Sequence, residues 1–139
     1  MRALIIDDDQ ISRKLLDTIM RNAGFSTDQA ADGVEAFEYV NKNEPYEVLL
    51  VDWDMPRMDG LQFIQKLIEY NKVKHSKIFM ITCHDTMEDA MTATALGIDG
   101  YLVKPIEVEK INRLLISFGF LKDEDESVDE SESEEKKSD

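Results

Sequence analysis

Two groups of aspartates stand out because each follows a short apolar run. Asp7 and Asp8 come directly after ALII, and Asp52 and Asp54 come after VLLV. Carboxylates that are brought close together repel one another strongly unless a cation lies between them. Oxygen ligands of this kind favour Mg²⁺, which commonly uses one or two carboxylates together with waters and phosphate oxygens. These residues predict a site for Mg²⁺ and a phosphoryl group.

A threonine and a lysine follow two further apolar runs. Thr82 ends the run at 77–82, and Lys104, which precedes Pro105, comes directly after the run at 101–103. The hydroxyl of Thr82 offers a hydrogen-bond donor to a phosphoryl oxygen, and Lys104 offers a positive charge. A carboxylate nucleophile, a metal ion, a lysine and a hydroxyl are the groups that phosphoryl transfer needs.

The elements that must position these residues alternate along the chain. Short apolar or weakly β-prone runs predict strands at 3–6, 25–30, 48–52, 77–82 and 101–103. Apolar residues at helical spacing predict helices between and after them, marked by Ile11, Leu15, Leu16 and Ile19; Val34, Phe37 and Val40; Leu61, Ile64, Leu67 and Ile68; and Ile106, Ile111, Leu114, Leu115 and Phe118.

Capping residues predict where some of these helices begin and end. Asp9 is predicted to cap the start of the first helix, and Gly24 to end it. Asp85, with Glu88 three residues later, predicts the start of the fourth helix. Gly97 is predicted to end that helix.

Five repeats of a strand followed by a helix favour one α/β domain, with a parallel sheet covered on both faces. This number of strands suits a flavodoxin-like doubly wound sheet with the strand order 2-1-3-4-5. In such sheets a ligand binds beyond the carboxyl ends of the strands, at the switch point between strands 1 and 3. Asp7, Asp8 and Asp52 are expected to meet there.

Composition limits the partners and the location. The 139 residues carry a net charge of −14, and residues 123–139 alone carry ten acidic and two basic residues. We expect a domain at 1–122 followed by a disordered acidic tail, which either keeps the protein soluble or tunes partner binding. The acidic surface argues against nucleic-acid binding. No apolar run has the length of a membrane span, and no signal peptide is recognisable. The only cysteine, Cys83, fits a reducing compartment. We therefore expect a cytoplasmic protein.

Four motifs, in order and spacing, carry a resemblance to a known family. They are LIIDDD at 4–9, VDWDMPRMDG at 51–60, MIT at 80–82 and GYLVKP at 100–105. Across residues 2–121 the sequence resembles the receiver domain of bacterial two-component response regulators.

The resemblance implies a role for each matching residue. Asp52 is the implied phospho-acceptor; the implied metal ligands are Asp8 directly, Asp7 through water, and the backbone carbonyl of Asp54. Thr82 and Lys104 are the implied partners of the phosphoryl oxygens, and Thr82 with Tyr101 forms the implied conformational switch. The metal is Mg²⁺, for which Mn²⁺ is expected to substitute. The Lys104–Pro105 peptide bond is expected to be cis.

The implied mechanism is transfer of a phosphoryl group from a histidine kinase or a phosphotransfer protein to Asp52. Phosphorylation then shifts a two-state equilibrium at the surface of helix 4, strand 5 and helix 5, and hydrolysis resets it. The protein catalyses only its own phosphorylation and dephosphorylation, so we do not expect an enzyme in the usual sense. It is expected to be a monomer, or a dimer through that surface when phosphorylated.

The output is expected to be a contact with another protein, because no output domain is recognisable. The Asp-Trp-x-Met-Pro form at 52–56 resembles the chemotaxis regulator that binds the flagellar motor switch. A phosphorelay intermediate and a phosphate sink remain alternatives.

Two other classes of protein are alternatives to a phosphoryl receiver. One is a haloacid-dehalogenase-like phosphatase, in which the aspartate pair follows the nucleophile, whereas Asp7 and Asp8 precede Asp52 here. The other is a binding module that acts without phosphorylation. A further hypothesis concerns His84 and Asp54, which match variable family positions and are expected to alter the access of water to phosphorylated Asp52.

Overall fold

The computed structural model describes residues 1–42 and 45–123. Strands and helices alternate in the order β1 (Arg2–Ile6), α1 (Gln10–Asn22), β2 (Ser26–Ala30), α2 (Gly33–Lys42), β3 (Val48–Val51), α3 (Gly60–Glu69), β4 (Lys77–Thr82), α4 (Met87–Thr94), β5 (Gly100–Val103) and α5 (Val108–Ser117). Beyond Asp123, the acidic tail predicted at 123–139 lies outside the described residues. The chain forms two compact units, the second of which begins at Val108 and contains α5.

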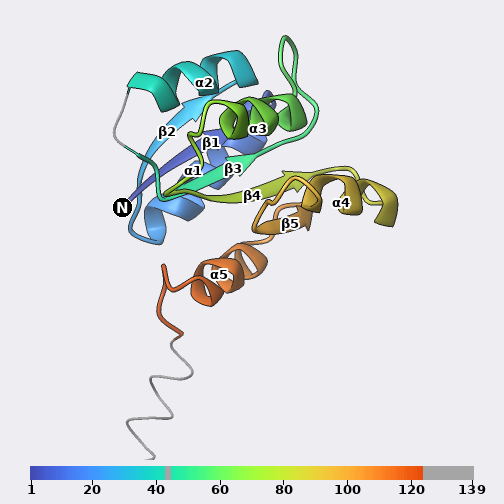
Figure 1. The fold of residues 1–139 in the computed structure, drawn as a ribbon. Coiled ribbons are helices and arrows are strands. Elements are labelled where there is room, and N and C mark those ends of the chain that lie inside the picture. The colour runs from blue at the N-terminus through green and yellow to red at the C-terminus, as the bar shows by residue number, and fades with distance from the viewer. Residues whose placement is uncertain (43–44, 124–139) are drawn as a thin grey trace, which may run out of the picture. The chain divides into compact units, whose positions relative to one another are not determined.

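The five strands form one parallel sheet with the order β2-β1-β3-β4-β5, which confirms the predicted flavodoxin-like topology (Figure 1). The last residues of neighbouring strands are in register, because Ile6 pairs with Val51, and Val51 pairs with Met80. Thr82 pairs with Val103 at the end of β4 and β5. This register brings the residues that follow the strands to one edge of the sheet.

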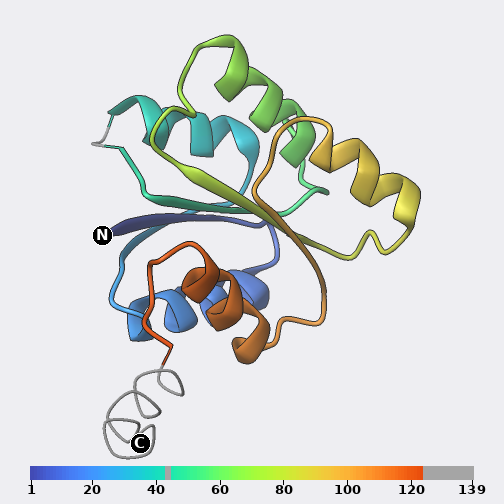
Figure 2. The same cartoon turned by 60° about the horizontal axis from the view of Figure 1, so that its bottom comes forward.

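Apolar side chains explain why β1 and β3 lie at the centre. All four residues of β3 are buried, as are Ala3 to Ile6 of β1. Within the first unit, α2, α3 and α4 cover one face of the sheet and α1 covers the other (Figure 2). A strand with helices on both faces needs apolar side chains in both directions, and these two strands have them.

The apolar stripe predicted for the first helix is only partly buried. Leu16, Ile19 and Met20 are buried, whereas Ile11 is 78% exposed and Leu15 is 41% exposed. At about 100° per residue, Ile11 lies about 130° around the helix from the centre of the buried set. Its exposure therefore follows from helical geometry.

The last helix is shorter than predicted. Helix α5 begins at Val108 and ends at Ser117, so that Ile106 and Phe118 fall outside it. Its buried residues are Ile111 and Leu115, four residues apart on one face.

Two helix starts test the predicted caps. Asp9 caps α1, since its carboxylate accepts a hydrogen bond from the Ser12 amide at 2.9 Å. The cap predicted for the fourth helix from Asp85 and Glu88 is wrong. Thr86 takes that position in an extended conformation, and its hydroxyl accepts from the amide of Asp89 at 3.1 Å. Threonine, like aspartate, is favoured at the position before a helix, because its side-chain oxygen can accept from the amide three residues later.

Candidate metal and phosphoryl site

Three aspartates meet at the carboxyl end of the central strands. One carboxylate oxygen each from Asp7, Asp8 and Asp52 lies within 4.8 Å of the other two. Asp7 and Asp8 follow β1, and Asp52 follows β3, where its amide donates to the Ile6 carbonyl at 2.9 Å. Asp7 is 1% exposed and Asp52 is 8% exposed. The predicted switch-point position of these carboxylates is therefore observed.

Lys104 lies against two of these carboxylates. Its Nζ is 3.0 Å from Asp7 Oδ2 and 3.4 Å from Asp52 Oδ2, and its side chain is 13% exposed. The lysine follows β5 directly, and its amide donates to the Thr82 carbonyl at 2.8 Å. The Lys104–Pro105 peptide bond is cis, as expected.

The electrostatics of this cluster favour an additional cation. Burial and the nearby charge of Asp7 together raise the pKa of Asp52 to about 6, although Lys104 opposes both effects. Burial alone would lower the pKa of Lys104, but the hydrogen bond and charge of Asp7, with the charge of Asp52, raise it. One ammonium group thus leaves the carboxylates incompletely neutralised. An all-oxygen donor set with excess negative charge fits Mg²⁺.

Thr82 and Tyr101 are joined to the site through the backbone of His84. Thr82 is fully buried at the end of β4, and its hydroxyl accepts from the His84 amide at 3.3 Å. The hydroxyl of Tyr101 donates to the His84 carbonyl at 2.9 Å. Both hydroxyl groups therefore bond to the backbone of the same residue.

The side chain of His84 bridges two acidic residues. Its Nε2 lies 2.8 Å from Asp54 Oδ2, and its Nδ1 lies 2.9 Å from Asp89 Oδ2. Trp53 stacks on the imidazole, with ring centroids 4.1 Å apart and an angle of 6° between the planes. Burial alone would lower the pKa of His84, but the hydrogen bonds to Asp89 and Asp54 raise it.

Sequence reasoning selected His84 and Asp54 but missed their neighbours. Asp89 was overlooked because the start of α4 was assigned to the wrong residues. The pattern Thr86-x-x-Asp89 is itself a helix-start signature and would have identified the correct cap. The stacking of Trp53 on His84 joins residues far apart in sequence and leaves no local signal.

The loop from Asp52 to Gly60, which follows β3, is tightly folded. Asp59 caps α3 and forms a reciprocal pair of hydrogen bonds with Gln62. The amide of Gly60 donates to the Trp53 carbonyl at 2.8 Å, and a Cβ at position 60 would overlap the carbonyl of Asp52. Only glycine fits there.

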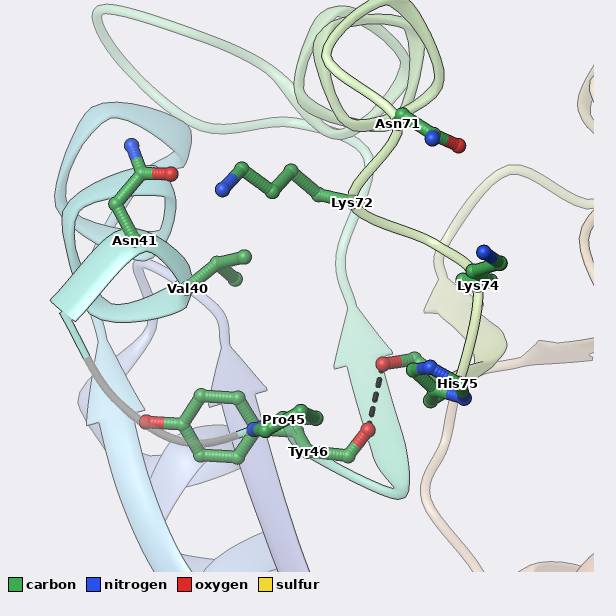
Figure 3. Close-up of a pocket in the computed structure, with 9 residues that line it drawn as sticks. Val40, Asn41, Pro45, Tyr46, Asn71, Lys72, Lys74 and His75 are labelled. Carbon is green, nitrogen blue, oxygen red and sulfur yellow. Dashed lines mark hydrogen bonds between the residues drawn. The ribbon is translucent and has the colours of Figure 1, made fainter.

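A separate cavity of about 430 Å³ lies at the opposite end of the strands, beside the residues that precede β3 and β4 (Figure 3). Tyr46 and Ser76 contribute to its wall, where the Ser76 hydroxyl donates to the Tyr46 carbonyl at 2.5 Å. The strands separate this cavity from the acidic cluster, so it takes no part in the site described above.

Comparison with known proteins agrees with the geometry. The family model of the response regulator receiver domain matches residues 3–116. The chain belongs to this family. Receiver domains are components of response regulators rather than enzymes that turn over an external substrate, and the acidic cluster fits their phosphoryl-accepting site.

Individual relatives cover most of the chain. A chemotaxis protein CheY homolog of Campylobacter jejuni is 32% identical over 116 residues, which are 83% of this chain and 89% of that protein. Chemotaxis protein CheY1 of Helicobacter pylori is 32% identical, over 83% of this chain and 94% of that protein. A CheX–CheY–BeF3–Mg²⁺ complex from Borrelia burgdorferi has a TM-score of 0.77 at 28% identity, over 85% of this chain and 88% of that chain.

No helix in residues 1–42 or 45–123 is both long enough and apolar enough to cross a membrane.

Proposed function

We propose that this receiver accepts a phosphoryl group on Asp52 from the phosphohistidine of a histidine kinase or a phosphotransfer protein. One observation carries the proposal. Asp52 is buried at the switch point of the sheet, within 4.8 Å of two further carboxylates and in contact with Lys104. A buried carboxylate surrounded by groups that stabilise phosphoryl oxygens is suited to act as a nucleophile.

In the proposed step, an ionised carboxylate oxygen of Asp52 attacks phosphorus. The bond between phosphorus and the donor imidazole nitrogen breaks, and its electron pair stays on the leaving imidazole. Lys104 stays protonated and faces the charge on the transferred group, and Thr82 donates a hydrogen bond to one of its oxygens. The ammonium of Lys104 suits this role because its pKa is raised.

For the metal, we propose Asp8 and Asp52 as direct carboxylate ligands, the Asp54 carbonyl as a third protein ligand, and Asp7 as a ligand through water. Mg²⁺ supplies charge neutralisation on the phosphoryl oxygens when bound. Mn²⁺, which also prefers oxygen ligands, is proposed to substitute for it.

The signal is reset when water hydrolyses phosphorylated Asp52. We propose that Asp54 and His84 restrict the approach of this water. Support comes from their mutual hydrogen bond of 2.8 Å, which is held from the other side by Asp89.

The proposed output is a contact with another protein. The surface expected from the sequence comprises helix 4, strand 5 and helix 5, and within it α4 exposes Met87 and Met91, at 77% and 63%. Tyr101 of β5 is the proposed reporter of the phosphorylated state, through its bond to His84. Because curated relatives are chemotaxis proteins, and a structurally similar CheY was solved with CheX, we propose chemotaxis as the pathway and the flagellar motor switch as the first partner to test.

The test is incubation of the purified protein with radiolabelled acetyl phosphate. We expect labelling that requires Mg²⁺, is abolished by a chelator and is absent from Asp52→Asn. Absence of label in the wild type would instead favour the binding module. Rapid turnover of an external phosphomonoester would favour the phosphatase.

A second experiment addresses the output. A pull-down with the phosphorylated protein and with Asp52→Asn should recover a partner only with the former. If the recovered partner is a phosphotransfer protein that removes the phosphoryl group, the receiver is a phosphorelay intermediate or a phosphate sink.

A further inference from the structure

The loop that carries Asp54 contains a strained residue. Arg57 has a φ of 68°, in the left-handed region that residues other than glycine, asparagine and aspartate rarely adopt. The Met58 amide donates to the Pro56 carbonyl at 2.7 Å, which closes a three-residue turn around Arg57. A γ-turn with positive φ at its centre is rare and strained, so that something else must hold it.

A partly buried ion pair joins this turn to Asp32, the residue that precedes α2. Arg57 Nε lies 2.8 Å from Asp32 Oδ2, and Nη2 lies 3.3 Å from Oδ1, so that the guanidinium donates a hydrogen bond to each carboxylate oxygen. The Asp32 side chain is 9% exposed, whereas that of Arg57 is 61% exposed. Asp32 is itself fixed, because Oδ1 also accepts from the Glu35 amide at 2.9 Å at the start of α2.

The backbone makes a second connection at the same place. The Gly33 amide donates to the Met58 carbonyl at 3.0 Å, and a Cβ at position 33 would lie 2.7 Å from that oxygen. The ion pair and this hydrogen bond are made by the adjacent residues Asp32 and Gly33. They tie the loop after β3 to the first residues of α2.

We propose that the Arg57–Asp32 ion pair is a clamp that holds the loop after β3 in a strained turn, and so keeps the Asp54 carbonyl and Asp52 in position for Mg²⁺. Arg57 and Asp32 are then positioning residues, which do not touch the metal or the phosphoryl group. This inference rests on the proposed function, because it needs Mg²⁺ at this site. The inference adds that Mg²⁺ affinity depends on an ion pair between two residues that are not metal ligands.

The clamp predicts different Mg²⁺ affinities for two variants that both remove the charge of Arg57. Arg57→Leu removes the ion pair and keeps the cost of the left-handed conformation, whereas Arg57→Gly removes both. We expect Mg²⁺ to bind about tenfold more weakly to Arg57→Leu. We expect a loss of no more than about threefold for Arg57→Gly.

Two further variants complete the set. Asp32→Asn keeps a side chain that accepts from the Glu35 amide but removes the charge, and should fall between the two Arg57 variants. Arg21→Leu is the matched control, because Arg21 pairs with Asp17 at 2.9 Å and is 64% exposed, but lies on α1 in ordinary helical conformation. It should bind Mg²⁺ as the wild type does.

The experiment measures Mg²⁺ affinity of the folded proteins by calorimetry, together with amide hydrogen exchange in the absence of metal. In Arg57→Leu, the amides of Gly33 and Met58 should exchange faster than in the wild type, and in Arg21→Leu they should not. The exchange readout needs no metal, and the affinity readout is insensitive to a change in global stability alone.

The outcomes separate the clamp from the proposed function. Equal affinity in the wild type and Arg57→Leu, or equal losses in the leucine and glycine variants, would overturn the clamp and leave the proposed function intact. Tighter binding in both Arg57 variants would show that Arg57 acts only by charge repulsion, which also overturns it. If the wild type bound no Mg²⁺, the metal site of the proposed function would fail, and the clamp's role at that site would fail with it.

Discussion

Replacing Asp52 by asparagine should stabilise the metal-free protein, although it removes the proposed phospho-acceptor. Asp52 is 8% exposed, lies close to Asp7 and shares a single ammonium group with it. An asparagine keeps the oxygen that accepts from the Trp53 amide at 2.7 Å. It removes only the charge, and Lys104 keeps its 3.0 Å contact with Asp7.

The magnitude follows from the pKa of Asp52, which rises from 3.8 to about 6 on folding. A difference of one pH unit in a pKa corresponds to about 1.4 kcal/mol, so the ionised carboxylate costs up to about 3 kcal/mol. Because the folded pKa is the higher one, this cost is absent below pH 3.8, grows as the pH rises to about 6, and is complete above it.

The assay is urea denaturation with a chelator present, at about pH 8 and about pH 5. At the higher pH, Asp52→Asn should have the larger free energy of unfolding, by up to about 3 kcal/mol. At the lower pH the difference should shrink, because the wild type binds a proton there. Added Mg²⁺ should stabilise the wild type more than the variant, since only the wild type has the full set of ligands.

A lower stability of Asp52→Asn at the higher pH would refute this reasoning, as would a difference that does not change with pH. Either result would mean that Lys104 already neutralises both carboxylates. The excess negative charge inferred for the site would then not exist.

Four other substitutions probe the same region. Gly60→Ala should lower the free energy of unfolding by about 1–3 kcal/mol, measured by urea denaturation, because its Cβ would overlap the Asp52 carbonyl. His84→Ala and Asp54→Asn should each speed loss of label from phosphorylated Asp52 about threefold to tenfold, and unchanged decay would remove their proposed role. Lys104→Met should destabilise the metal-free protein by about 3 kcal/mol, and Mg²⁺ should restore part of that loss.

The sheet and the position of the acidic cluster were predictable because they follow from local patterns. Short buried runs separated by helical stripes predict a doubly wound sheet, and its topology brings the ends of β1 and β3 together. Asp7, Asp8 and Asp52 each directly follow one of these runs. Their convergence therefore depends only on strand order, for which five alternating strands and helices suit the order 2-1-3-4-5.

Contacts between side chains from distant segments were not predictable in this way. His84 and Asp54 are 30 residues apart in the sequence, and their hydrogen bond depends on rotamers that no periodicity encodes. The ion pair of Arg57 with Asp32 likewise joins residues far apart in the sequence, so no local pattern predicts it. The positive φ of Arg57 could not be predicted either, because arginine does not favour this conformation. The missed cap at Thr86 differs, since Thr86-x-x-Asp89 is a local capping pattern that overlaps Asp85-x-x-Glu88 in the sequence.

We propose Asp52 as the residue that receives the phosphoryl group. The most direct test is to treat the protein with acetyl phosphate and Mg²⁺, reduce the acyl phosphate with borohydride, and locate the modified residue by mass spectrometry of proteolytic peptides. We predict modification at Asp52 alone, and none when Mg²⁺ is chelated. Modification at another residue, or equal labelling of Asp52→Asn, would contradict it.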